Sequence, residues 1–85
     1  MVNTSERYYT VDIIVNDRDK AYDKVNEILH DFAKYIKLRV GYPVIEENFA
    51  VIFIIFKATN DLLGNFTGKL GQIQNVRVKS IPITK

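Results

Sequence analysis

The chain contains no cysteine among its 85 residues. This absence excludes disulfides and every thiolate metal site. The single histidine, His30, cannot build a metal site of any usual ligand set, so we expect no metal and no cofactor. A chain of this length buries only about 60–65% of the surface of its unfolded state, and small domains gain stability from disulfides, metals or oligomerisation. Since the first two are excluded, the composition favours oligomerisation.

Excess charge of one sign is also absent, because 12 basic residues are nearly balanced by 10 acidic ones and the net charge is +2. Nucleic-acid-binding modules usually show a stronger basic excess, so this balance does not indicate such a partner. The longest apolar run, residues 49–56, is too short to cross a bilayer as a helix. Residues 1–6 lack the apolar core of a signal peptide. We therefore expect a cytoplasmic protein with no membrane partner.

The apolar periodicity predicts a β-α-β-β-α-β chain. Alternating apolar residues indicate strands, and apolar residues at helical spacing indicate helices. In chain order, the predicted elements are a strand at 7–15, a helix with its apolar stripe at 21–33, strands at 36–45 and 49–56, a helix with its stripe at 62–73, and a strand at 76–83. This is the ferredoxin-like α+β arrangement, in which a four-stranded antiparallel sheet of order 4-1-3-2 carries two helices on one face.

The placement of proline supports this sheet order. Proline cannot donate a backbone hydrogen bond to a sheet and is tolerated on its edges. Pro43 and Pro82, the only two prolines, fall in the second and fourth predicted strands, which are the edge strands. We expect a single domain at 7–85, preceded by a flexible tail at residues 1–6.

The third predicted strand is apolar on both faces. Since the helices cover only one face of the sheet, its second set of apolar side chains would form an uncovered patch, which is typical of a protein–protein contact. We predict that Phe53 and Ile55 contribute to a homo-oligomer, either a dimer or a tetramer. The alternative is an exposed sheet with scattered apolar residues. The other side chains expected on this face are Tyr8, Thr10, Asp12, Ile14, Arg39, Arg77 and Lys79.

Three glycines fall on one stripe of the second predicted helix, opposite its apolar stripe. Each glycine inside a helix costs about 1 kcal/mol relative to alanine. One interpretation of Gly64 and Gly68 is contact with a neighbouring subunit or a ligand, whereas Gly71 is interpreted as the C-cap of the helix. The spacing is not that of a dinucleotide-binding fingerprint.

The loop after the first predicted strand is one candidate ligand site. Its residues Asn16, Asp17 and Arg18 come directly before the first helix. Backbone amides at a helix N-terminus, together with Arg18, can hold a small anion. The alternative is an ordinary helix cap with a solvated arginine.

A second candidate ligand site lies on the second predicted strand. Arg39, Gly41 and Tyr42 occur together on this edge strand, and an arginine can pair with a carboxylate through two hydrogen bonds. The alternative is an outward-facing charge beside a glycine bulge.

No set of residues provides a nucleophile, a base and a group that orients the base. His30 lies among acidic neighbours on the polar side of the first helix, and neither Ser5 nor Ser80 has a histidine partner in foreseeable reach. We predict no catalytic residue and no enzymatic activity.

RNA-recognition domains share this topology and stack bases on aromatic residues of the first and third strands. Here Tyr8 and Phe49 fall on those strands. The basic residue and glycine expected before the aromatic are replaced by Glu47 and Asn48, which puts an acid where a phosphate would lie. Single-stranded nucleic-acid binding is therefore an alternative that the sequence does not favour. A further alternative is that the chain is a structural module that binds a protein partner.

Six segments carry a family resemblance: DRDKAY (17–22), VNE (25–27), LRVGYPV (38–44), EEN (46–48), GKLGQI (68–73) and VRVK (76–79). Over residues 8–83 the chain resembles small bacterial proteins described as regulators of the iron-only hydrogenase system, a role that is itself inferred. The resemblance implies an ACT-like domain, related in fold to the effector-binding half of nickel-responsive repressors. It also implies a homo-oligomer of sheets. We predict a regulatory or sensor role, and the two candidate sites suggest a small carboxylate or amino-acid-like ligand.

Two departures limit what the resemblance implies. Amino-acid-binding ACT domains typically have glycine in the loop after the first strand, where this chain has Asn16 and Asp17. Nickel-responsive regulators use histidine and cysteine ligands, which this chain cannot supply. The resemblance itself supplies no established catalytic or ligand-binding residue to carry over.

Overall fold

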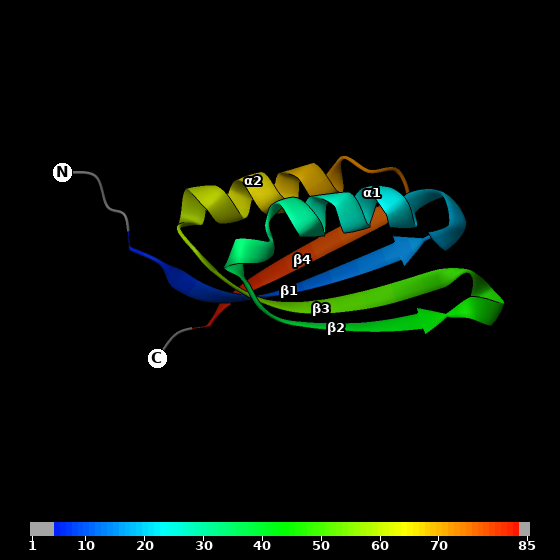
Figure 1. Ribbon diagram of the computed structural model, residues 1–85, viewed down its shortest axis with the longest axis horizontal. Helices are drawn as coiled ribbons and strands as arrows, with labels where there is room; N and C mark the ends of the chain where they lie inside the picture. The colour runs from blue at the N-terminus through cyan, green and yellow to red at the C-terminus, as the bar shows by residue number, and fades with distance from the viewer. Residues whose placement is uncertain (1–4, 84–85) are drawn as a thin grey trace.

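Four antiparallel strands and two helices follow one another in the predicted order (Figure 1). The computed structural model describes residues 5–83. The elements are β1 (Arg7–Asn16), α1 (Arg18–Asp31), β2 (Ile36–Val44), β3 (Phe49–Ala58), α2 (Asn60–Gly71) and β4 (Val76–Ile83), with short 3-10 turns η1 (Ala33–Tyr35) and η2 (Ile45–Glu47). The sheet order β2-β3-β1-β4 is the predicted order 4-1-3-2 seen from the other edge, so the predicted fold class is confirmed. Residues 1–4 of the predicted tail and residues 84–85 lie outside the described part.

The core lies between the sheet and the two helices, which both cover the same face of the sheet (Figure 1). Alternate residues of β1 and β3 are buried there, because successive side chains of a strand point to opposite faces. The helices contribute the buried residues Ala21, Val25, Leu29, Leu63, Phe66 and Leu70. The rings of Phe56 and Phe66 stack with their centroids 4.4 Å apart. Burial of each large apolar side chain contributes roughly 1.5–3 kcal/mol, so this face of the sheet is the main source of stability.

Strand β2 departs from strict alternation at Lys37. The register with β3 shifts between Ile36 and Leu38. Ile36 pairs with Phe56 and packs against the core, whereas Leu38 pairs with Ile55 on the opposite face. A strand with one extra residue reverses the faces of the side chains that follow, and this bulge decides where the candidate residues of β2 lie.

The two helices begin in different ways. At α2, Thr59 is the N-cap, and its hydroxyl oxygen accepts a hydrogen bond from the Leu62 N–H at 3.2 Å. At α1, Asp17 occupies the N-cap position with a left-handed backbone (φ 51°), and its side chain makes no cap hydrogen bond. The end of α2 also differs from expectation. Gly71 is the last helical residue and its φ is not positive, so its interpretation as the C-cap is wrong; the positive φ of this connection falls on Asn75.

Candidate functional sites

The sheet face away from the helices, called here the open face, carries most of the exposed large apolar side chains. They are Tyr8, Leu38, Val40, Tyr42, Ile81 and Ile83. Of the exposed large apolar residues in the described part, Ile45 lies elsewhere, in η2. Within residues 5–83, no helix or strand lies over the open face (Figure 1).

Strands β2 and β3 form the apolar half of the open face. The register places three side chains of β2 beside three of β3, in the pairs Leu38–Ile55, Val40–Phe53 and Tyr42–Val51. Val40 is 52% exposed and Tyr42 is 68% exposed, whereas the three β3 residues are half-buried. These six side chains, called here the apolar half, form a continuous patch next to an edge of the sheet. Predicted contact residues Phe53 and Ile55 both belong to it.

Strands β1 and β4 carry the charged part of the open face. Asp12 of β1 pairs with Phe53 of β3 on one side and with Lys79 of β4 on the other. Arg77 pairs with Ile14. The open face therefore combines an apolar half with a half in which both signs of charge occur.

The other predicted contact residues, Gly64 and Gly68, lie on the exposed surface of α2. A Cβ atom added at either position would meet no atom within 4 Å, so nothing inside the described protomer requires glycine there. The structure therefore does not bring the two predicted contact groups together, because one is on the helix layer and the other is on the open face. A contact role for the glycines stays a prediction.

The N-terminus of α1, the first predicted ligand site, contacts Asn48 from the turn before β3. The carbonyl oxygen of Asn48 accepts from the Arg18 N–H (3.0 Å), and its side-chain oxygen accepts from the Asp19 N–H (3.3 Å). Its side-chain amide donates to Asp17 Oδ1 (3.2 Å). The N–H of Asn16 also has a partner, a backbone carbonyl in the loop before β4. The backbone donors that a small anion would use are thus already paired within the chain.

The side chain of Arg18, which is half-buried, lies beside this cap. Its guanidinium carbon lies 4.5 Å from the centroid of the Tyr22 ring, a cation–π arrangement. Among residues 5–83, Arg18 Nε is the buried side-chain nitrogen or oxygen that lacks a hydrogen-bond partner. Tyr22 in turn lines a pocket of about 120 Å³ between α1 and β2, called here the α1–β2 groove. Its lining residues are Tyr22, Gly41, Tyr42, Pro43, Ala50 and Ile52.

Gly41 and Tyr42 of the second predicted ligand site line the α1–β2 groove, whereas the first predicted site is connected with it only through the contact of Arg18 with Tyr22. The expectation that Arg39 lies on the open face is wrong. Arg39 pairs with Ile54 on the helix side of the sheet, and its Nη2 donates to Asn26 Oδ1 of α1 at 2.6 Å. The bulge at residue 37 is the physical reason, because it reverses the faces of the β2 residues that follow.

A comparison with models of known protein families shows the family to which the chain belongs. A family model matches residues 7–80, from the start of β1 into β4. This TM1266-like family is described as "Iron-only hydrogenase system regulator, putative". The chain belongs to this family. The resemblance carried by the six sequence segments is confirmed.

Two solved structures place this family member among known folds. The uncharacterized protein TM1266 from Thermotoga maritima is 55% identical, with a TM-score of 0.90, over 94% of this chain and 100% of that one. A conserved protein of unknown function from Bacteroides thetaiotaomicron, described as a "Possible Oxidoreductase", is 13% identical, with a TM-score of 0.54, over 95% of this chain and 100% of that one. The second likeness shows the fold alone. No curated protein matches the chain.

Sequence inspection missed three residues at the candidate sites: Tyr22 lines the groove, Asn26 binds Arg39, and Asn48 caps α1. Arg18, Tyr22 and Asn26 are four residues apart on α1 and therefore lie along one side of the helix, and this spacing was the available signal. It could not be connected with β2 without knowledge of the bulge. Over residues 5–83, no helix is long and apolar enough to span a membrane, and no three acidic or histidine side chains gather as metal ligands.

Proposed function

We propose that this family member is a homo-oligomeric regulatory module of the iron-only hydrogenase system, and that its copies associate through the apolar half of the open face. The observation that supports this most strongly is the patch of six apolar side chains on β2 and β3, which no part of the described chain covers. An apolar patch of this kind on a small protein marks an interaction surface. Burial between subunits would also supply the stability that a small domain without disulfides needs.

A second copy of the chain is the occupant that suits this patch. A two-fold contact uses the same surface on both subunits, so the surface must be complementary to itself. An apolar patch meets this requirement, because none of its six side chains carries a charge to repel its counterpart. The interspersed charges of β1 and β4 then form the rim, as in an ordinary protein–protein contact.

The substitution Val40→Glu tests this proposal. Val40 is on an edge strand and half-exposed, so glutamate at this position does not disturb the core of the protomer. At a subunit contact it would bury an unpaired charge, which opposes association. We expect light scattering at micromolar concentration to give an oligomer for the unsubstituted chain and the mass of one chain, 9.8 kDa, for Val40→Glu.

Ile45→Glu is the matched control, because Ile45 is 75% exposed but lies in η2, outside the apolar half. This variant should keep the mass of the unsubstituted protein. A single-chain mass for the unsubstituted protein would contradict the proposal, as would a Val40→Glu variant that stays assembled.

We further infer that the α1–β2 groove is the site of a small carboxylate or amino-acid-like ligand. Arg18 provides a guanidinium that stacks on Tyr22 and has an unsatisfied Nε, and arginine is suited to bind carboxylates. Gly41 leaves the groove open, since a Cβ atom there would meet nothing within 4 Å. Arg39, whose Nη2 donates to Asn26 Oδ1 at 2.6 Å, is a second cation on the same side of the sheet, outside the lining of the groove.

Thermal unfolding with acetate, glycine or glutamate tests this site. A ligand at about one hundred times its dissociation constant adds roughly 2.7 kcal/mol. For a domain of this size the expected rise in Tm is about 10 °C or more. Arg18→Gln should abolish the rise, whereas Lys24→Gln, on the exposed surface of the same helix, should retain it. The same Tm with every compound, or a rise that Arg18→Gln does not reduce, would contradict the assignment.

Nucleic-acid binding through the open face has less support. Tyr8 and Phe53 do lie on that face, where bases could stack. However, the carboxylate of Asp12 lies between Phe53 and Lys79 in the sheet, which places a negative charge in the path of a phosphate backbone. We also propose that the module has no catalytic role. Single-strand binding that weakens steeply with salt would favour the nucleic-acid alternative.

A further inference from the structure

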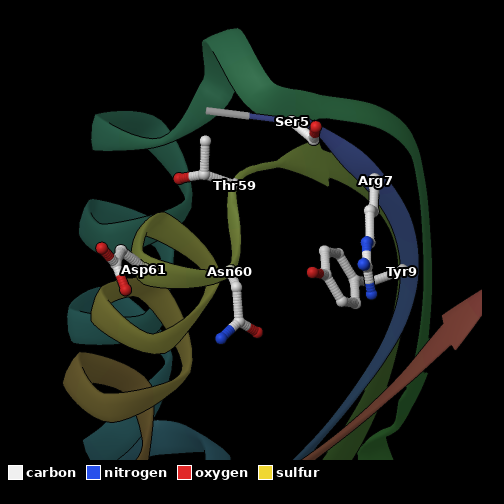
Figure 2. A pocket seen from close by; sticks show the side chains of 6 residues that line it. All are labelled: Ser5, Arg7, Tyr9, Thr59, Asn60 and Asp61. Atoms are coloured by element: carbon white, nitrogen blue, oxygen red, sulfur yellow. The ribbon is translucent and has the colours of Figure 1, made fainter. Parts of the chain in front are cut away.

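A pocket of about 350 Å³ lies between the start of β1 and the start of α2 (Figure 2). Its lining residues are Ser5, Arg7, Tyr9, Thr59, Asn60 and Asp61. Arg7 pairs with Ala58, the last residue of β3, and this pairing brings the beginning of β1 next to the N-terminus of α2. The pocket is at the end of the sheet opposite to Asn48 and the α1–β2 groove, and none of its residues belongs to the sites described above.

Tyr9 is the feature of this pocket that points to a ligand. The residue is only 4% exposed and belongs to the core, where it pairs with Phe56. Its hydroxyl group points into the pocket, toward Asn60 (Figure 2), and forms no hydrogen bond with any residue of the described part. The ring is packed in the core while the hydroxyl oxygen itself reaches the pocket, so a ligand bound there can take the place of solvent as its hydrogen-bond partner.

The groups around this hydroxyl favour an anion. Arg7 lines the same pocket as Tyr9 (Figure 2), and its guanidinium forms no ion pair with a residue of the described part. Thr59 accepts hydrogen bonds from the N–H groups of Leu62 and Leu63. The first two N–H groups of α2, those of Asn60 and Asp61, have no partner among the described residues. These free donors carry the positive end of the helix dipole.

Among the described residues that line the pocket, Asp61 is the one with an acidic side chain. Its carboxylate points away from the Tyr9 hydroxyl, on the far side of the helix start (Figure 2). We propose that this pocket binds a small oxyanion, a carboxylate or a phosphate, that accepts hydrogen bonds from the Tyr9 hydroxyl, the Arg7 guanidinium and the first N–H groups of α2. This site does not depend on the proposed oligomer or on the α1–β2 groove.

Titration of the amide resonances of Asn60 and Asp61 by NMR tests the proposal. Sodium acetate and sodium phosphate are added in separate experiments, with sodium chloride at the same ionic strength as the reference. We expect a saturating shift of both resonances with at least one of the two oxyanions, and the anion that saturates identifies the class. Shifts that follow the chloride reference in both experiments would overturn the proposal.

Tyr9→Phe removes only the hydroxyl and retains the buried ring. A hydrogen bond to a charged group corresponds to an affinity change of about tenfold to a hundredfold, and this weakening is the expected result. Tyr8→Phe, the same change on the adjacent residue of the open face, should bind as the unsubstituted chain does. Equal affinity of Tyr9→Phe and Tyr8→Phe would overturn the assignment.

Arg7→Gln provides a second test at an exposed position where folding is not at risk. We expect it to weaken binding at least about tenfold, because it removes a charge-assisted hydrogen bond. Arg18→Gln should leave the titration unchanged, which separates this pocket from the α1–β2 groove. Loss of binding in Arg18→Gln together with unchanged binding in Arg7→Gln would contradict the assignment.

Discussion

Asn48 closes the N-terminus of α1 from a distant part of the sequence. It has a left-handed backbone, with φ at 53°, and its carbonyl and side-chain oxygens accept from the first two N–H groups of the helix. Its amide group also donates to Asp17, the N-cap residue, whose own side chain makes no cap hydrogen bond. The turn between β2 and β3 therefore does the capping that the residue before the helix usually does.

The side chain of Asn48 should thus contribute measurably to stability. We expect Asn48→Gly to lower the free energy of unfolding by about 1 kcal/mol more than Asn75→Gly. Asn75 is a matched control, because it also has a positive φ (71°) but its side chain makes no hydrogen bond with the described residues. Urea unfolding of the two variants gives the difference, and equal effects would show that the Asn48 side-chain bonds contribute nothing.

Strand β2 contributes to two of the three proposed sites, the apolar half and the α1–β2 groove. Its residues after the bulge alternate between the apolar half of the open face and the α1–β2 groove, so that Val40 faces one site and Gly41 faces the other. Every residue of this strand is exposed or half-buried in the protomer. As an edge strand it is held by β3 alone, and a subunit contact on its open face would bury it further.

Helix α2 gives a test of the glycine interpretation. Gly68→Ala should raise the free energy of unfolding by about 0.5–1 kcal/mol, because alanine is the better helix former and its Cβ meets no atom within 4 Å. Gly64→Ala should behave in the same way. Urea unfolding measures the gain, and light scattering reports the assembly. A variant that loses assembly would show that α2 forms the subunit contact instead of the open face.

Most elements were predictable from periodicity, because the buried residues of β1, β3 and both helices alternate or repeat as the patterns require. The faces of β2 were not predictable. Both faces of this strand are weakly buried, so the pattern holds no signal for the bulge at Lys37 that moved Arg39 to the helix side. The groove joins residues of α1 to residues of β2, and their contact depends on that bulge.

Local sequence also could not reveal which distant groups the polar atoms of Asn48 and Tyr9 meet. Asn48 caps α1 across 30 residues of chain, and Tyr9 belongs to the core pattern while its hydroxyl lies in a pocket with the start of α2. Arg18, by contrast, was identified from its place at the start of a helix. Contacts between distant elements define what these side chains can bind, and those contacts follow from the sheet register.

At the scale of the whole molecule, one layer of helices covers one face of the sheet and the other face stays open (Figure 1). The covered face contains the core, and the open face contains the apolar half on β2 and β3. A sheet with helices on one side is stable as a single chain only if its other face tolerates water, and six adjacent apolar side chains do not favour that. The arrangement is accounted for if a second copy of the chain covers the apolar half.

An isotope-filtered NOE measurement on a mixture of labelled and unlabelled chains tests this claim most directly, because it detects only contacts between subunits. We predict intersubunit NOEs from the methyl groups of Val40, Val51 and Ile55. Intersubunit NOEs confined to α2 around Gly64 and Gly68, or no intersubunit NOE from a protein of single-chain mass, would contradict association through the open face.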